Sequence, residues 1–237
     1  MERIILIETS TALCSAALAE NGHITSYRES SAPKAHASLT AVFIQEMLEE
    51  RGLNLGDCDA ICVSMGPGSY TGLRVGVSTA KGLCFGAKKP LLAAGTLDTL
   101  VAQALDEVIT DQTEDLKHII PMVDARRMEV YTAVFSRKEG EATFTQTTET
   151  APAIIDENSF ADLLEEGPCL FIGDGAGKCA DVINHPNARF HQCWPKASAM
   201  LHPAIEAYRK ERFEDVAYFE PFYLKEFVAT VSKKKLW

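Results

Sequence analysis

The segment from residue 60 to residue 86 constrains the fold of this chain more than any other part of its sequence. Its first residues, Ala60–Val63, are apolar and typical of a buried strand. A Gly-Pro-Gly turn at 66–68 follows, where the glycines can adopt positive φ and the proline holds its own φ fixed. Apolar residues then recur at helical spacing after Ser69, which is a good N-cap residue. The segment therefore predicts a strand, a sharp turn and a helix that spans Ser69–Phe85.

One side of this predicted helix carries only small residues, because Gly72, Gly76 and Ala80 lie three or four residues apart. Another backbone can approach such a face closely. The approaching backbone could belong to a partner helix or to this protein's own sheet, and the start of the helix could instead hold an anion such as phosphate. The segment matches neither the P-loop pattern nor the three-glycine spacing of a dinucleotide site. We favour the docking of a partner helix.

Residues 64–77 resemble the signature G-P-G-S-[FY]-T-G-L-R-[IV]-G of the bacterial TsaB family, also called YeaZ. Further matches follow in the same order along nearly the whole chain: Glu8-Thr9-Ser10, His36-Ala37 with Leu39, Asp124-Ala125-Arg126, Glu129-Val130-Tyr131, Gly173-Asp174-Gly175-Ala176 and Pro221-Phe222-Tyr223-Leu224-Lys225. TsaB is the partner subunit in the synthesis of threonylcarbamoyladenosine, the modified base beside the tRNA anticodon. The resemblance implies the same role for this chain.

The composition indicates a soluble globular protein that does not grip nucleic acid on its own. Of the 237 residues 46% are hydrophobic, and the net charge is -10. Because tRNA binding depends on neutralising phosphates, we expect only weak binding by the chain alone. No apolar run is long enough to cross a membrane, the first strand begins too early for a signal peptide, and the seven cysteines lack paired spacing. These features favour the reducing cytoplasm.

The two halves of the chain show similar orders of predicted elements. In the first half these are the strands Arg3–Glu8, Ala12–Glu20 and His23–Arg28, the helix His36–Glu50, the strand Ala60–Ser64, the helix Ser69–Phe85, the strand Leu91–Ala94 and a helix from Thr96 to about Val108. In the second half they are the strands Ile119–Asp124, Glu129–Phe135 and Ala142–Thr148, the helix Phe160–Leu164, the strand Leu170–Gly173, the helices Gly177–Asn184 and Ser198–Arg212, and the segment Val216–Phe227.

This weak internal duplication is typical of the actin-like ATPase superfamily, and the TsaB resemblance implies the same fold. We therefore expect an α/β protein with the two-lobed actin-like ATPase (ASKHA, ribonuclease H-like) fold, each lobe a mixed sheet with flanking helices. The first lobe is expected at residues 1–117 and the second at 118–237, with the C-terminal segment packing back on the first lobe.

Five residues are candidates for binding a nucleotide between the lobes. Glu8 and Asp124 end the leading strands of the two halves, where acids of catalytic actin-like proteins handle metal and phosphate. TsaB proteins usually carry Asp at the position of Glu8, and the longer side chain would shift any metal geometry. Gly173, Asp174 and Gly175 form a glycine-rich turn after a strand, but the spacing does not fit a P-loop, which favours an ordinary strand-to-helix turn.

The residue types that commonly bind metals or act as nucleophiles are not arranged for catalysis in this sequence. None of the six histidines has a His or Cys three or four residues away, the spacing that holds a metal on one helix face. The catalytic TsaD relatives carry a His-x-x-x-His metal pair at the positions where this chain has Thr96 and Leu100. Ser69 does not lie in a nucleophile elbow. We therefore expect neither a metal site nor a catalytic residue.

Together these observations predict a non-catalytic partner protein. By resemblance, the helices His36–Glu50 and Ser69–Phe85 form a helical bundle with a TsaD subunit, or with a second copy of this chain when TsaD is absent. The residues expected to contact the partner are His36, Leu39, Phe43, Ser69, Thr71, Gly72, Arg74, Val75, Gly76, Thr79 and Leu83.

By the same resemblance, TsaD would supply metal and catalysis, and TsaE would supply ATPase action. tRNA would bind only through the complex, where ATP or ADP could also enter, and the isolated chain would carry no cofactor. The alternative is an enzyme of the same fold, either a peptidase or a small-molecule kinase or ATPase.

Overall fold

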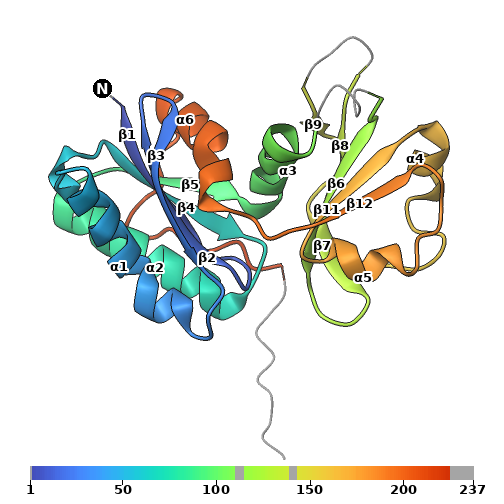
Figure 1. Cartoon of the computed structure of the whole chain (residues 1–237), viewed down its shortest axis with the longest axis horizontal. Coiled ribbons are helices and arrows are strands. Elements are labelled where there is room, and N and C mark those ends of the chain that lie inside the picture. The colour runs from blue at the N-terminus through green and yellow to red at the C-terminus, as the bar shows by residue number, and fades with distance from the viewer. Residues whose placement is uncertain (1, 110–114, 139–142, 225–237) are drawn as a thin grey trace, which may run out of the picture.

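Two α/β lobes lie side by side in the computed structural model, which describes residues 2–109, 115–138 and 143–224 (Figure 1). The first lobe contains β1 (Arg3–Glu8), β2 (Cys14–Glu20), β3 (His23–Ser30), α1 (Ala35–Glu50), η1 (Leu55–Asp57), β4 (Ala60–Gly66), α2 (Tyr70–Ala87) and β5 (Leu91–Gly95). α3 (Thr96–Glu107) leads to β6 (His118–Asp124), β7 (Glu129–Thr132), β8 (Phe135–Ser136), β9 (Thr145–Gln146), β10 (Ala151–Ile154), α4 (Ala161–Glu166), β11 (Cys169–Gly173), α5 (Ala176–Ala180) and β12 (Ala188–Gln192). The chain returns to the first lobe through η3 (Ala197–Met200) and α6 (Leu201–Arg209).

The main sheets of the two lobes share one topology. Their strand orders are β3-β2-β1-β4-β5 and β10-β7-β6-β11-β12. In each sheet the leading strand, β1 or β6, pairs antiparallel with the next strand and parallel with a later one. The duplication predicted from the sequence is therefore present in the described structure.

The second sheet differs from the prediction in its outer strands. Only residues 145–146 of the predicted strand Ala142–Thr148 form a strand, and residue 142 lies outside the described residues. The position equivalent to β3 is occupied by β10, which pairs with β7. The predicted strand Glu129–Phe135 is divided into β7 and β8, and β12 was not predicted at all. These strands are short, so tertiary pairing rather than a sequence period determines them.

Both faces of the first sheet are covered by helices (Figure 1). Ile5 and Ile7 of β1 face the cluster that includes residues of α1 and α2, whereas Ile4 and Leu6 face η3 and α6. This alternation is the two-residue period of a strand that is buried on both sides. β1 is accordingly the central strand of the first lobe.

The packing of the elements does not follow a single boundary at residue 117. α3 contributes Leu97, Leu100 and Val101 to the core cluster beside the second sheet. η3 and α6, which follow the second lobe in sequence, cover the first sheet instead. By packing, β1–β5 with α1, α2, η3, α6 and the segment up to residue 224 form the first lobe, and β6–β12 with α4 and α5 form the second. α3 lies between the two lobes and contacts both.

The segment after α6 lies along the first lobe up to the last described residue. The backbone N–H of Glu214 donates to the carbonyl oxygen of Leu91 at 2.8 Å, and that of Phe222 donates to Met65 at 2.7 Å. Between these two points, Lys81 Nζ of α2 donates to two carbonyl oxygens of the segment, at 3.0 and 3.1 Å. The segment is therefore anchored along one flank of α2. Residues 225–227 of the predicted C-terminal element lie outside the described residues.

The small-residue face of α2 faces this protein's own backbone, so its assignment as a docking surface is wrong. Gly72 and Gly76 are buried. A Cβ atom on Gly72 would lie 2.1 Å from the carbonyl oxygen of Thr9, and one on Gly76 would lie 2.2 Å from Thr9 Oγ1. The glycines allow α2 to press onto the turn after β1, which is the alternative that the sequence left open.

We expect Gly72→Ala and Gly76→Ala each to lower the free energy of unfolding by about 1–3 kcal/mol through overpacking. Gly72→Ala should cost more, because it meets a backbone atom whereas Gly76→Ala meets a side chain that can rotate. Gly82→Ala is the matched control on the same helix, since no atom lies within 4 Å of its added Cβ. It should be stabilising by about 0.5–1 kcal/mol. Urea unfolding followed by circular dichroism measures all three, and equal stability of the Gly72 and Gly82 variants would contradict the assignment.

Candidate functional site

A pocket of about 630 Å³ lies between the two lobes. The first lobe contributes the turn after β1, His36 and the start of α2, and the second lobe contributes the ends of β6 and β11. The C-terminal segment completes the wall with residues 222–224. The volume lies in the range of pockets that bind small molecules. We call this cavity the interlobe pocket.

Glu8 lies beneath the first-lobe wall and does not line the interlobe pocket. Its side chain is fully buried, and Oε1 accepts a hydrogen bond from the backbone N–H of Ser10 at 2.6 Å. The other carboxylate oxygen, Oε2, has no partner among the described residues. Burial raises the pKa of the Glu8 carboxyl to about 7, because the charged form loses its hydration. Glu8 thus holds the turn after β1 and does not face a ligand.

The turn after β1 is locked to both neighbouring helices. The backbone N–H of Ser69, the N-cap of α2, donates to the carbonyl oxygen of Ser10 at 2.6 Å. Nε2 of His36, near the start of α1, donates to the carbonyl oxygen of Thr11 at 2.8 Å. The Ser69 hydroxyl accepts from the Gly72 N–H at 3.3 Å, which caps α2. His36 and Ser69 therefore have structural roles, whatever else they contact.

The second-lobe wall carries two acids that already have partners. Lys178 forms an ion pair with Asp124 and also donates to the carbonyl oxygen of Glu129 at 2.6 Å. Asp174 Oδ1 accepts from the backbone N–H of Asp124 at 2.9 Å. Burial raises the pKa of the Asp174 carboxyl to about 6. The wall is consequently less negative than its two carboxylates alone would make it.

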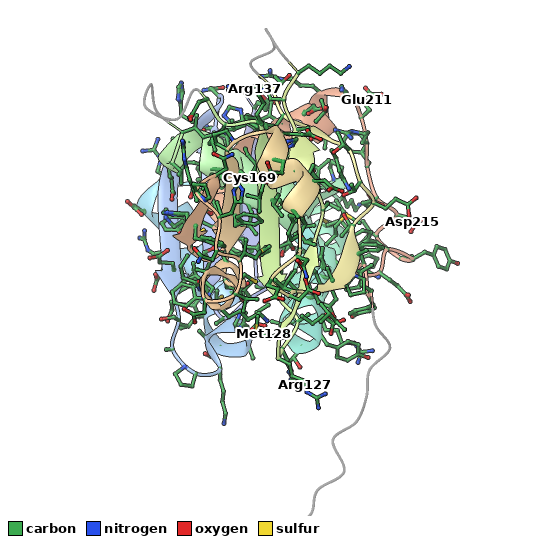
Figure 2. All side chains as sticks on the ribbon, turned by 90° about the vertical axis from the view of Figure 1, so that its right-hand side faces the viewer. Arg127, Met128, Arg137, Cys169, Glu211 and Asp215 are labelled. Atoms are coloured by element: carbon green, nitrogen blue, oxygen red, sulfur yellow. The ribbon has the colours of Figure 1, made fainter. Side chains whose placement is uncertain are left out.

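Arg126 is a pocket residue that the sequence analysis did not select. It lies in the turn between β6 and β7 next to Arg127, and both adopt positive φ, 72° and 52°. This left-handed conformation is unfavourable for residues with a Cβ atom, so no sequence rule predicts it for two consecutive arginines. Figure 2 shows Arg127 at the end of the molecule, pointing outward, and Arg127 does not line the pocket.

The five residues predicted as candidates for nucleotide binding differ in whether they line the interlobe pocket. Asp124 and Asp174 line it, whereas Glu8, Gly173 and Gly175 do not. A Cβ on Gly173 would lie 2.3 Å from the carbonyl oxygen of Met122, and one on Gly175 would lie 2.8 Å from a Val130 methyl group. The two glycines therefore allow close packing inside the second lobe. Whether a nucleotide binds stays a prediction.

The outward side of α2 forms a second candidate site. Thr71, Val75, Ser78, Gly82 and Phe85 follow one another at intervals of three and four residues along this side, and all except the half-buried Val75 are exposed. We call these five residues the outer stripe of α2. Phe85 has 81% of its surface exposed. On α1, which lies beside α2, Val42 is 41% exposed.

The residues predicted to contact a partner differ in how far their side chains are buried. Phe43, Gly72 and Gly76 are buried and cannot form a surface, so their assignment is corrected. Leu39 and Leu83 are half-buried against the core cluster of the first lobe. The remaining residues reach the surface in full or in part: His36, Ser69, Thr71, Arg74, Val75 and Thr79. Ser78, Gly82 and Phe85 were missed, although their spacing with Thr71 could have indicated a common face.

Thr96 and Leu100 occupy the two positions where metal-binding histidines would be needed, and both lie in the protein core. Thr96 and Leu100 of α3 are both fully buried, and Leu100 packs beside the second sheet. Within residues 2–109, 115–138 and 143–224, no group of three or more His, Cys, Asp or Glu side chains could hold a metal ion. No helix in these ranges is long and apolar enough to cross a membrane.

Comparisons with known proteins identify the relatives of this chain. Residues 28–168 match the model of the TsaD family, described as tRNA N6-adenosine threonylcarbamoyltransferase. The chain is 29% identical to the tRNA threonylcarbamoyladenosine biosynthesis protein TsaB of Escherichia coli, with 96% of each chain covered. It is 30% identical to TsaB of Bacillus subtilis, over 72% of this chain and 70% of the relative. The solved structure of YeaZ from Pseudomonas aeruginosa superposes with a TM-score of 0.79 at 26% identity, and covers 94% of this chain and 100% of YeaZ. The fold is thus the two-lobed α/β fold of the YeaZ structure, with a mixed sheet and flanking helices in each lobe, as predicted.

The buried Glu8 carboxyl should make stability depend on pH. An unfolded chain loses this proton near pH 4.5, but the folded chain keeps it up to about pH 7. The free energy of unfolding therefore falls as pH rises between these values, by roughly 3 kcal/mol in total. Glu8→Gln should remove this fall and be more stable than the unchanged protein above pH 7, with less difference at pH 4.5.

Urea unfolding at several pH values measures the effect, and Glu20→Gln is the control. Thr25 hydrogen-bonds to the Glu20 carboxyl and lowers its pKa, so this variant should lose stability at neutral pH. Parallel pH profiles for Glu8→Gln and the unchanged protein would rule out a raised Glu8 pKa.

Proposed function

This chain belongs to the TsaD family and within it to the TsaB (YeaZ) proteins of tRNA threonylcarbamoyladenosine biosynthesis, and we propose that it is a non-catalytic subunit that binds and supports TsaD. TsaD then transfers the threonylcarbamoyl group to tRNA adenosine, and TsaE acts as the ATPase of the system. When TsaD is absent, a second copy of this chain occupies the same surface. The protein works in the cytoplasm, where its seven free cysteines stay reduced.

One observation carries this proposal: the metal-ligand positions of the catalytic relatives hold buried, non-ligating residues. Leu100 has no donor atom, and Thr96 begins α3 with its side chain fully buried. A transferase that needs a metal at this place would have to obtain it from another subunit. The role of a supporting partner requires no such ligands, so it fits these residues better than catalysis does.

The outer stripe of α2 supports α1 and α2 as the docking surface. The first sheet covers the inner side of α2, α1 lies beside it, and the C-terminal segment is bonded to Lys81 on a flank. The side of α2 that none of these elements covers carries the small residues Thr71, Ser78 and Gly82. They lie next to the exposed ring of Phe85. Small residues let a partner helix approach closely, and an exposed aromatic side chain is a common anchor of protein interfaces.

The net charge of -10 supports an indirect contact with tRNA. A chain with this charge gains little from counterion release, so affinity for tRNA must come mainly from another subunit. The alternative function is an enzyme of the same fold, a peptidase or a small-molecule kinase or ATPase, which the interlobe pocket could serve. Bound metal together with turnover by the isolated chain would favour that alternative.

Reconstitution with purified components distinguishes the proposed non-catalytic role from the enzymatic alternative. With TsaD, TsaE, threonylcarbamoyl-adenylate and tRNA, we expect base modification to require this chain, while the chain alone forms no product. The product is measured by mass spectrometry of digested tRNA. Modification at the same rate without the chain, or by the chain alone, would overturn the proposed role.

Ser78→Arg tests the docking surface without disturbing the fold. Ser78 is exposed at the middle of the outer stripe, so the long charged side chain should leave the thermal midpoint nearly unchanged. It should weaken association with TsaD by more than about tenfold, because it keeps the two helices apart and buries an unpaired charge. Ala161→Arg, on exposed α4 of the other lobe, is the matched control and should bind normally. Analytical ultracentrifugation of mixtures gives the affinity, and normal binding by Ser78→Arg places the interface elsewhere.

A further inference from the structure

A second cavity, of about 530 Å³, is lined by α3 and α6, which lie beside each other (Figure 1). Residues of β4 and β5, Arg212 and Glu214, and two phenylalanines of the second lobe complete its lining. Among the described residues, none lines both this cavity and the interlobe pocket. The volume lies in the range of sites that hold small molecules. We call it the α3–α6 cavity.

Most of the lining of the α3–α6 cavity is apolar. Four of its residues share one side of α3, because the last three follow the first by three, four and seven positions. They are Asp98, Val101, Ala102 and Leu105. Leu105 has 41% of its surface exposed. A hydrocarbon chain that covers this side of α3 would leave water, which favours its binding. The other apolar residues of the lining are Met65, Ala93, Ala94, Phe135, Phe144, Pro203 and Ala207.

Asp98 places a carboxylate at the start of this apolar side. Its side chain is open to the cavity, yet the surrounding protein raises the pKa of the carboxyl because the charged form loses hydration. The basic residues of the lining are directed to other acids: Arg212 Nη2 lies 3.3 Å from Glu206, and His202 Nε2 lies 4.0 Å from Asp106. Within the described structure Asp98 forms no ion pair, so a cation that reaches it would gain a full partner.

The remaining charges of the lining favour a cation over an anion. Glu206 is neutralised by Lys210 at 2.7 Å together with Arg212. Arg212 also attracts Asp98, but this effect on the Asp98 pKa is smaller than that of lost hydration. Glu214 is a second acid of the lining, and it forms no ion pair within the described residues. The cavity thus combines apolar walls with two acids that lack a close cation.

We propose that the α3–α6 cavity binds a small primary aliphatic amine. The ammonium group lies at Asp98, and the alkyl chain lies along Val101 and Leu105. An ammonium has three N–H donors, so Glu214 can accept a second hydrogen bond. Because several segments of the chain surround a volume of small-molecule size, we assign the cavity to a free amine. This binding does not depend on the proposed role beside TsaD.

An amine in this cavity would touch both lobes. α6 packs on the first sheet, whereas Phe135 and Phe144 belong to the cluster beside the second sheet. α3 contacts elements of both lobes. A ligand held between these elements binds the folded chain and not the unfolded one, so a saturating amine should raise the thermal midpoint.

Titration of the full-length chain with n-hexylamine at pH 7 tests the proposal, with NMR shifts of methyl groups as the readout. We expect saturation with a dissociation constant below about 1 mM, and shifts at Val101 and Leu105. n-Butylamine should bind about tenfold more weakly, because two CH₂ groups fewer are buried. n-Hexanol, which has the chain without the charge, should bind more weakly than n-hexylamine. Absence of saturation, equal affinity for the alcohol, equal affinities of the two amines, or shifts confined to the interlobe pocket would overturn the proposal.

Two aspartates of α3 provide a matched pair of variants. Asp98→Asn should weaken n-hexylamine binding by about tenfold or more, because a charge-assisted hydrogen bond is lost. Asp106→Asn removes the same charge from the same helix but outside the cavity lining, so it should bind the amine normally. Leu105→Ala should reduce the advantage of n-hexylamine over n-butylamine, which gives a second readout that does not involve the charge. Thermal melts establish that the variants are folded. Equal affinities of the two aspartate variants would show that the ammonium does not lie at Asp98.

A capped lysine distinguishes a free amine from a protein side chain. Nα-acetyl-lysine amide carries the same ammonium and butyl chain as n-butylamine, joined to two peptide groups. We expect it to bind more weakly than n-butylamine, because the polar peptide groups would lie against the apolar lining. Tighter binding of the capped lysine would overturn the assignment to a free amine and would place a lysine of another protein in the cavity.

Discussion

The contact between α2 and the turn after β1 is the constraint on which the rest of the first lobe depends. Thr9 lies directly under Gly72 and Gly76, at distances that leave no room for a Cβ atom. The same turn receives the N–H of Ser69 at the start of α2, and Thr9 donates its own N–H to Ser64 Oγ of β4. These contacts fix the N-terminal half of α2 against the turn after β1, and they fix that turn to β4. The position of α2 determines both which side of the helix remains exposed and where its N-terminus meets the interlobe pocket.

The consequence for function is that two candidate sites share one helix. The N-terminus of α2 forms part of the interlobe pocket, while its outer stripe faces away from the sheet. The C-terminal segment touches both regions, because Lys81 holds its middle and Tyr223 packs on Tyr70 at its end. A rigid helix of 18 residues transmits displacements along its length better than a loop does. The outer stripe and the interlobe pocket are therefore joined by a continuous set of contacts through α2 and the C-terminal segment.

The sequence predicts the architecture well where residue patterns repeat, and less well where tertiary contacts decide. The apolar run of β4, the glycine turn and the period of α2 were sufficient to place the strand, the turn and the helix at the centre of the first lobe. β10 was missed because it is a four-residue edge strand with an internal proline, Pro152, and little alternation. The spacing of Gly72 and Gly76 showed a smooth face but not which backbone would cover it. Similarly, Glu8 was a strand-end candidate for nucleotide binding, but the structure shows it fully buried and outside the pocket. Arg126 becomes a pocket residue only through a left-handed turn.

The order of the lobes along the chain has a consequence for synthesis on the ribosome. The second lobe is continuous in sequence, whereas the sheet of the first lobe is covered by η3 and α6, which are translated after the second lobe. Until those residues emerge, Ile4, Leu6 and Leu92 present an uncovered apolar surface in the nascent protein. Exposed surfaces of this kind aggregate or recruit chaperones. The half of the molecule that is made first is therefore completed last, and a ribosome that stops before residue 197 releases a chain with its first lobe open.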